Sequence, residues 1–337
     1  MYRYAIIGFG GLGKKHLCNL IKIEQERKDI SLAAICGTTE EDARKNVSIN
    51  LGMIDVSSLD FSGCNFYQDY KEMIDTEELN FILSVLPTFL HEEVAVYALS
   101  KGIHVFSEKP MALTVEGCEN MMKAAKNNSR ELMIGQCLRF HTGFRKIKDY
   151  IDSGELGKVR GAYFDKNSQT PCWTFNDWIL DPKQSGGCPI DMHIHDVDLI
   201  NWFFGKPNSL CSTVRSTKLP LEGIVTQYFY DDFSVVAQAD WSLPQTFPFD
   251  EICRIDFEKA SIVVRNDKLS IYYDDKSFEE EYDAEEAFVA EIEAFLNMII
   301  DKKPCDDITS PESICDTLKI AVAEIESAEK KAEIFFR

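Results

Sequence analysis

The hydrophobic pattern of the first 135 residues alternates between short apolar runs and longer amphipathic segments. Helices are predicted at residues 12–28, 91–101 and 115–127. Between them lie short buried strands, at residues 4–7, 32–36, 80–86, 103–106 and 132–134. Strands that alternate with helices are typical of parallel βαβ units. This half of the chain therefore predicts a doubly wound α/β sheet.

The pattern changes after about residue 135. A helix at 144–151 is followed by strands with few helices between them, at 159–166, 209–215, 224–230, 235–241, 252–257, 262–265 and 269–273. The acidic stretch 274–286 is expected to be a solvated loop and helix start, and two helices, at 285–301 and 312–331, end the chain. We predict an α+β domain with an open, largely antiparallel sheet. The predicted division is 1–130 and 131–337.

A glycine cluster follows the first predicted strand and opens the first helix. Gly8, Gly10 and Gly13 match the G-x-G-x-x-G pattern. In this context the first glycine permits a tight turn, the second lets backbone approach a pyrophosphate, and the third lets helix pack on strand. The N–H groups at the helix start attract an anion. We predict a Rossmann domain that binds a dinucleotide, with a purely structural turn as the alternative; the candidate residues are Gly8, Phe9, Gly10, Gly11, Leu12 and Gly13.

The end of the second predicted strand bears on which dinucleotide is bound. Rossmann domains commonly carry an acidic residue there, which binds the adenosine ribose. This chain has Gly37 followed by Thr38 and Thr39, with no carboxylate and no immediate arginine. These three residues are candidate cofactor contacts, and either NAD or NADP is consistent with them.

Lys109 lies where a catalytic group is expected in such a sheet. It follows the strand at 103–106 within Glu108-Lys109-Pro110, and ligands bind beyond the carboxyl ends of parallel strands. The proline restricts the backbone of the lysine before it and so fixes its direction. A surface lysine in a turn is the alternative interpretation.

A second candidate site lies in the segment 186–198. If the chain is helical from Asp191 onward, Asp191 and His195 share one helix face. An aspartate and a histidine beside a cofactor can move a proton at neutral pH, which alcohol oxidation requires. A zinc site formed by Asp191, His193 and His195 is the rival interpretation. We favour proton transfer and predict no metal, because residues two apart on a helix point in different directions.

Composition and charge limit the partners. The 337 residues carry a formal net charge of −20, which argues against nucleic acid and anionic membranes. No apolar run is long enough to span a bilayer, and no cleavable leader is evident, so we expect a cytoplasmic protein. The 11 cysteines form no C-x-x-C pair and are expected to be reduced thiols.

Together these residues resemble the glucose-fructose oxidoreductase, inositol dehydrogenase and rhizopine catabolism family, Gfo/Idh/MocA. The resemblance covers nearly the whole chain. The similar segments are 8–13, 67–74, 85–91, the signature 98–110 that ends in Glu-Lys-Pro, 135–140, and the Gly-Gly…Asp-x-x-x-His stretch from 186 to 195. Two positions depart from the family pattern: Phe89 stands where Asn is frequent, and His193 where many members have Gly.

The resemblance implies roles for individual residues. Lys109 would hydrogen-bond the reacting oxygen, His195 would be the general acid/base, and Asp191 would bind substrate and tune the histidine. These groups of the two domains are expected to meet over the nicotinamide ring. The remaining implied cofactor residues are Pro87, His91 and Glu108. The candidate substrate residues are Arg139, Trp173 and His193, the last of which is either in contact with substrate or one layer behind it.

The resemblance also implies an activity. We expect an NAD(P)-dependent dehydrogenase or reductase that moves a hydride between nicotinamide and a secondary alcohol of a sugar, inositol or related polyol. The alternatives are an enzyme that uses tightly bound NAD(P) transiently, as epimerase, sugar–sugar oxidoreductase or glycosidase, and a non-catalytic sugar or dinucleotide sensor. A homodimer or homotetramer, assembled through the outer face of the second sheet, is implied as well.

Overall fold

The chain forms two compact units. The computed structural model describes residues 1–49, 52–283, 285–303, 306 and 308–336. One unit consists of Met1–Gly135 and Phe288–Pro311, and the other of Gln136–Ala287 and Glu312–Arg337. Each unit contains its own sheet, and each is described separately below.

The first unit is built on a parallel sheet, as predicted from the sequence. Its strands lie in the order β5-β2-β1-β6-β7-β8, and every neighbouring pair is parallel. This is the Rossmann order, which reverses between β1 and β6 and places the ligand crevice at that point. The strands are β1 (Tyr2–Ile7), β2 (Ile30–Cys36), β5 (Asn65–Tyr67), β6 (Phe81–Ser84), β7 (His104–Glu108) and β8 (Leu132–Gly135).

Helices connect these strands, and several start at side-chain caps. Thr114 accepts a hydrogen bond from the N–H of Gly117, and Asp69 accepts from Lys71 and Glu72, so both cap a helix start. β5 and a small hairpin, β3 (Val47–Ile49) with β4 (Gly52–Ile54), were not predicted because they are only three residues long. The helices are α1 (Gly11–Arg27), α2 (Glu40–Ala43), α3 (Tyr70–Thr76), η1 (Thr88–Leu90), α4 (His91–Ser100) and α5 (Val115–Asn128).

The helix α10 (Glu285–Ile299) comes late in the chain, yet most of it belongs to the first unit. Its Phe295 is completely buried, and its ring centroid lies 5.8 Å from those of Phe81 and Phe106. Just beyond the helix, Asp301 forms an ion pair of 3.2 Å with Arg27 of α1. A division of the sequence into two continuous segments does not anticipate this return, because it depends on packing between distant segments.

The second unit contains a mostly antiparallel sheet, as predicted. Its strands lie in the order β16-β15-β14-β13-β9-β12-β11-β10-β17, and only β9 and β12 run parallel among the described strands. They are β9 (Val159–Gln169), β10 (Ser209–Arg215), β11 (Gly223–Phe229), β12 (Ser234–Leu243), β13 (Asp250–Phe257), β14 (Ser261–Arg265), β15 (Lys268–Tyr272), β16 (Ser277–Glu281) and β17 (Ile334–Phe335).

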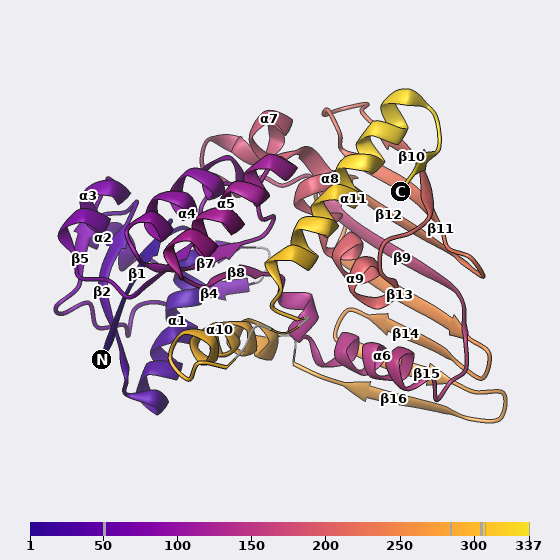
Figure 1. Cartoon of the computed structure of the whole chain (residues 1–337), viewed down its shortest axis with the longest axis horizontal. Helices are drawn as coiled ribbons and strands as arrows, with labels where there is room; N and C mark the ends of the chain where they lie inside the picture. Colours follow the sequence, from indigo (N-terminus) through magenta and orange to yellow (C-terminus); the bar gives the residue numbers. More distant parts are fainter. Residues whose placement is uncertain (50–51, 284, 304–305, 307, 337) are drawn as a thin grey trace. The chain divides into compact units, whose positions relative to one another are not determined.

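One face of this sheet is covered by helices of the same unit (Figure 1). Burial alternates along β11, where Ile224 and Tyr228 are buried and Val225 is exposed, as expected for a sheet with one covered face. The helices of this unit are η2 (Cys137–Phe140), α6 (Thr142–Ser153), η3 (Phe175–Leu180), α7 (Pro182–Ser185), α8 (Gly187–Asp191), α9 (Ile194–Phe204) and α11 (Pro311–Lys330).

The acidic stretch 274–286, of which the structure describes all but residue 284, contains an edge strand that the sequence analysis did not predict. β16 pairs with β15 along Ser277–Glu281, and all five of its residues are exposed. The expected solvation is thus confirmed for this strand, and its charges block further pairing at the sheet edge. No helix in the described part of the chain has the length and apolarity needed to cross a membrane.

The packing of α10 gives a first prediction. We expect Phe295→Ala to lower the free energy of unfolding by about 3–5 kcal/mol, because it opens a cavity between the rings of Phe81 and Phe106. Phe278→Ala is the matched control, since Phe278 is 55% exposed, and should change stability by less than about 0.5 kcal/mol. Denaturant unfolding of both variants measures the difference, and equal losses would contradict this assignment of α10.

Candidate active site

The glycine turn joins β1 to α1 at the point where the sheet order reverses. A Cβ added to Gly8, whose φ is +89°, would lie 2.2 Å from the carbonyl oxygen of Val85, beyond the end of β6. A Cβ on Gly13 would lie 2.2 Å from the carbonyl oxygen of Gly8. A Cβ on Gly10 would have no protein atom within 4 Å. The turn is therefore closed on the protein side at Gly8 and Gly13 and open at Gly10, as the motif predicts.

The start of α1 is suited to bind an anion. Gly10 is its N-cap and provides no side chain to cap the helix, and the first turn contains no acidic residue. The first helical hydrogen bond runs from the N–H of Lys14 to the carbonyl of Gly10. The N–H groups of the first turn and the positive end of the helix dipole therefore favour a phosphate group. Together with the open side of Gly10, this arrangement fits the pyrophosphate of a dinucleotide.

The end of β2 lies beside this turn and is polar. The N–H of Gly8 donates to Cys36, and the N–H of Gly37 donates to Tyr67. Thr38 accepts a hydrogen bond from the side chain of Gln68, and Thr39 caps α2. Arg44, one turn further on, forms an ion pair of 2.8 Å with Glu40. The predicted cofactor residues Gly37, Thr38 and Thr39 thus lie at the same edge of the sheet as Gly8.

His91 links two turns at this edge. Its Nε2 lies 2.8 Å from the carbonyl oxygen of Leu86, and its Nδ1 lies 2.7 Å from that of Pro110. The residue is completely buried, and burial lowers its pKa. A neutral imidazole has one N–H and donates to one of these carbonyls at a time. His91 therefore ties the turn around Pro87 to the turn that contains Lys109.

Lys109 is the accessible residue of its motif. Glu108 is 6% exposed and Pro110 is also buried, whereas Lys109 is half-buried. The backbone N–H of Lys109 donates to Oε2 of Glu108 at 3.2 Å, and Nε2 of His16 lies 2.6 Å from Oε1 of the same carboxylate. Lys109 therefore directly follows Glu108, whose two carboxylate oxygens both have hydrogen-bond partners.

In the second unit, the segment around His195 forms two helices, whereas a single helix from Asp191 was assumed. α8 ends at Asp191 and α9 begins at Ile194. The N–H of His193 bonds to Cys188, five residues back, which widens the turn at the joint. Met192 keeps a right-handed helical backbone, so the chain continues in nearly the same direction. Asp191 and His195 both stay half-exposed, whereas Met192, His193 and Ile194 are buried.

His193 belongs to a buried polar cluster. Its Nε2 lies 3.3 Å from Oε1 of Glu324 and from the hydroxyl of Tyr228, and its Nδ1 lies 3.6 Å from Oδ2 of Asp196. Burial alone would lower the pKa of His193, but Glu324 and Asp196 raise it to about 9. Asp196 is in turn paired at 3.2 Å with Lys166. These contacts favour the interpretation in which His193 lies one layer behind the residues that would contact substrate.

Arg139, a candidate substrate residue in the sequence, lies in a buried ion pair of the second unit. Its side chain is completely buried, and two of its nitrogens lie 2.7 Å from the two oxygens of Asp198. Its guanidinium also donates to Ser313, and Asp198 accepts a further bond from Thr317. Such a bidentate pair satisfies both charges in the interior. The guanidinium of Arg139 is therefore engaged within the core of this unit.

Trp173, the other candidate substrate residue, lies between β9 and η3. It is 37% exposed, and the neighbouring Phe175 is 84% exposed. Asn176 and Asp177 follow with left-handed backbone, which turns the chain sharply after the aromatic pair. Exposed rings of this kind can stack on the apolar face of a sugar.

The sequence analysis did not identify the buried or half-buried titratable partners around these sites. They are His16, Lys166, Glu251, Glu291 and Glu324. The sequence could have revealed them in one way. A charged residue that falls on the apolar face of a predicted helix or strand is expected to be buried and therefore to have a partner. Glu291, for example, lies within the apolar run Phe288-Val-Ala-Glu-Ile292 and shares a helix face with Phe288 and Phe295.

The chain matches two models of one family. Residues 2–136 match the model described as "Oxidoreductase family, NAD-binding Rossmann fold" of GFO_IDH_MocA, and residues 144–263 match the "GFO/IDH/MocA C-terminal domain". Both predicted folds agree with these models.

The similarity to individual characterised proteins is low in sequence identity. The chain is 26% identical over 229 residues to inositol 2-dehydrogenase of Salmonella paratyphi B, which covers 64% of this chain and 61% of that protein. It is 25% identical over 206 residues to 2,7-anhydro-N-acetylneuraminate hydratase of Escherichia coli, covering 61% of this chain and 50% of the hydratase. The matches thus span between half and about three fifths of these proteins.

A solved structure with the same fold is that of levoglucosan dehydrogenase in complex with NADH and L-sorbose. The TM-score is 0.84, the sequence identity is 18%, and the match covers 100% of this chain and 99% of that one. The likeness extends over both units and confirms the fold of each.

The glycine turn gives a second prediction, which rests on a matched pair of variants. Gly13→Ala should lower the free energy of unfolding by about 1–3 kcal/mol, because its Cβ meets the backbone of Gly8. Gly10→Ala meets no protein atom and should change stability by less than about 1 kcal/mol, yet weaken dinucleotide binding at least about tenfold. Denaturant unfolding and titration with NAD and NADP measure both. Wild-type affinity in Gly10→Ala would contradict the assignment of this turn to the cofactor.

The His193 cluster gives a third prediction, on pH. Because the pKa of His193 is raised from 6.5 to about 9, its pairing stabilises the fold fully below pH 6.5, and this contribution is lost as the pH rises through about 9. Relative to His193→Gln, the wild type should be more stable by an amount on the order of 3 kcal/mol at low pH, with the difference shrinking above pH 9. Denaturant unfolding across this range tests it, and a pH-independent difference would show that folding does not shift the pKa of His193.

Proposed function

Because the chain belongs to the Gfo/Idh/MocA oxidoreductase family, we propose that it is an NAD(P)-dependent dehydrogenase or reductase acting on a secondary alcohol of a sugar, inositol or related polyol. The observation that carries the proposal is the selective exposure of three residues. Lys109, Asp191 and His195 stay half-exposed, whereas the residues on both sides of Lys109 are buried and those between Asp191 and His195 are buried as well.

The glycine turn and the start of α1 would hold the pyrophosphate, with Phe9, Gly11 and Leu12 forming the walls of the turn. Gly37, Thr38 and Thr39 would border the adenosine ribose, and Pro87 with His91 the nicotinamide half. When bound, NAD(P) supplies the acceptor or donor of the hydride. No carboxylate directly follows β2, so this end of the strand fits either NAD, with its ribose 2′-hydroxyl, or NADP, with its 2′-phosphate.

The protein residues supply the remaining chemistry. As the alcohol is oxidised, His195 would take the proton that its hydroxyl loses. The ammonium of Lys109 hydrogen-bonds the same oxygen and stabilises the negative charge that develops on it. Asp191 orients the imidazole and binds a neighbouring hydroxyl of the substrate. Reduction of a ketone reverses each step, and Trp173 offers a surface on which the sugar ring can stack.

A cytoplasmic location and a homodimeric or homotetrameric assembly belong to the same proposal. The assembly is implied by the family resemblance. The oligomer would use the outer face of the second sheet, where Val225 and Tyr272 are exposed.

A second candidate function is catalysis with a tightly held cofactor that is reduced and reoxidised within one turnover. The relative named as a hydratase favours it, because the addition of water to a substrate involves no net oxidation. Epimerases and glycosidases of this kind would return the hydride to the same substrate, and sugar–sugar oxidoreductases would pass it to a second sugar. A sensor without catalysis is disfavoured, because the lysine and the histidine are both present.

Steady-state assays test the proposal. We expect reduced cofactor to accumulate with some member of a panel of inositols, aldoses and anhydrosugars. Lys109→Ala and His195→Ala should each lower kcat/KM by about 100-fold or more. Lys123→Ala, an exposed lysine on α5, is the matched control.

Two outcomes would change the conclusion. Full activity in both Lys109→Ala and His195→Ala would refute the assigned roles. Product formation without accumulation of reduced cofactor would favour the second candidate function.

A further inference from the structure

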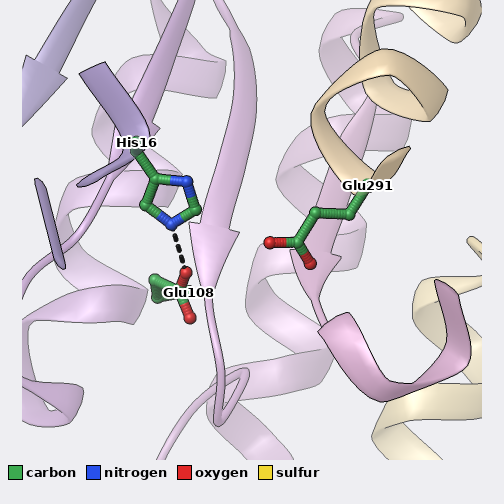
Figure 2. Close-up of side chains that lie close together, drawn as sticks. All are labelled: His16, Glu108 and Glu291. Carbon is green, nitrogen blue, oxygen red and sulfur yellow. Dashed lines mark hydrogen bonds and ion pairs between the residues drawn. The ribbon is translucent and has the colours of Figure 1, made fainter. Parts of the chain in front are cut away.

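A cluster of three titratable side chains lies in the interior of the first unit (Figure 2). His16 comes from α1, Glu108 from the end of β7, and Glu291 from α10. His16 and Glu291 are completely buried, and Glu108 is 6% exposed. One nitrogen or oxygen atom from each residue lies within 4.8 Å of those of the other two. Three polar groups gathered in the interior require an explanation, because burying them without partners is costly.

We propose that Glu108 is a positioning residue for Lys109, held in place by His16 and faced by Glu291, a neutral acid that keeps its proton and directs it toward the carboxylate of Glu108. The inference rests on the proposed function in one respect, namely the role of Lys109 toward substrate. None of the three residues is proposed to touch substrate.

The contacts of Glu108 support the first part of the proposal. A carboxylate only accepts hydrogen bonds, so the ring nitrogen of His16, 2.6 Å from Oε1, must donate. On the other oxygen, Oε2 accepts the backbone N–H of Lys109 at 3.2 Å. The carboxylate is thereby fixed at both oxygens, and one of these bonds is to the backbone of the proposed catalytic lysine. His91 holds the next residue, through the carbonyl of Pro110.

The surroundings of Glu291 support the second part. Figure 2 shows its carboxyl group directed toward the other two side chains. Neither of its oxygens has a hydrogen-bond partner among the described residues. Burial, and then the nearby Glu108, raise the pKa of Glu291 well above its usual value. A neutral carboxyl group carries a proton that needs an acceptor, and Glu108 is the carboxylate of this cluster.

The walls of the cluster are apolar, which strengthens this reasoning. The ring of His16 lies 5.8 Å from that of Phe106 and 6.2 Å from that of Phe288, edge to face. Two ionised carboxylates in such surroundings repel each other strongly, and one of them then keeps its proton. Glu108 has two donors already, so Glu291 is the group that stays neutral.

A metal ion is the rival occupant, since one histidine and two carboxylates are possible zinc ligands. The geometry does not favour it. Two ligands on one tetrahedral zinc lie about 3.3 Å apart, given bonds of about 2.0 Å. The 2.6 Å between His16 and Glu108 is a hydrogen-bond distance.

Matched variants test the proposal. Glu108→Gln should lower kcat by about tenfold or more, with a smaller change in KM, because a displaced lysine fails in the transition state. Glu291→Met and His16→Leu should do the same. Glu291→Gln and His16→Gln should restore most of the loss, because each amide is neutral and keeps an N–H donor.

A second readout needs no turnover. The rate at which acetic anhydride labels Lys109, followed by mass spectrometry, should change at least about threefold in Glu108→Gln, Glu291→Met and His16→Leu. Labelling of the exposed Lys123 should stay unchanged in each. If the wild type transfers no hydride, the proposed function fails, and labelling still decides whether the cluster positions the lysine.

Three results would overturn the proposal. The first is a folded Glu291→Gln protein that loses as much activity as Glu291→Met. The second is unchanged labelling of Lys109 in folded Glu108→Gln. The third is a stoichiometric metal in the purified wild-type protein that is absent from Glu291→Gln.

Discussion

A carboxylate that is taken out of water must be matched by donors or by a positive charge, and this requirement shapes both units. Glu108 precedes Lys109 and is bound by His16. Asp196 follows His195 and is paired with Lys166. An unmatched buried charge costs several kcal/mol, which is a large part of the stability of a domain. The chain therefore holds the residue next to each proposed reactive group firmly in place.

This arrangement separates stability from reactivity. The buried neighbours carry the fixed hydrogen bonds, and Lys109 and His195 keep part of their surface. A side chain that must change its hydrogen bonds during a reaction cannot also be essential to the core. A reactive side chain next to a residue with fixed hydrogen bonds has a fixed backbone position, while its functional group stays accessible.

The sequence was sufficient to predict the features that depend on local pattern. The strands of the first unit alternate with helices, and the glycine turn has a steric reason at Gly8 and Gly13. β5 and the β3–β4 hairpin were missed, because three residues carry too little periodicity. The helix break at Met192 was missed as well, since both halves have helical composition.

The remaining differences between prediction and structure arise from contacts between residues that are distant in the sequence. Arg139 lies in a segment that resembles part of a binding domain, but its partner Asp198 is 59 residues away, and only the fold shows that the two charges satisfy each other. Glu291 and Glu324 likewise meet their neighbours only in three dimensions. A sequence shows on which face of a helix a charged residue lies. It does not show which element packs against that face.

The late position of α10 has a consequence for synthesis of the chain. The first unit needs Phe295 and Glu291, yet the ribosome produces the whole segment Gln136–Ala287 before either residue. Until then, Phe81 and Phe106 lack their partner from this helix. The first unit therefore reaches its complete core only after the segment Gln136–Ala287 of the second unit has been translated, which makes its maturation a late event.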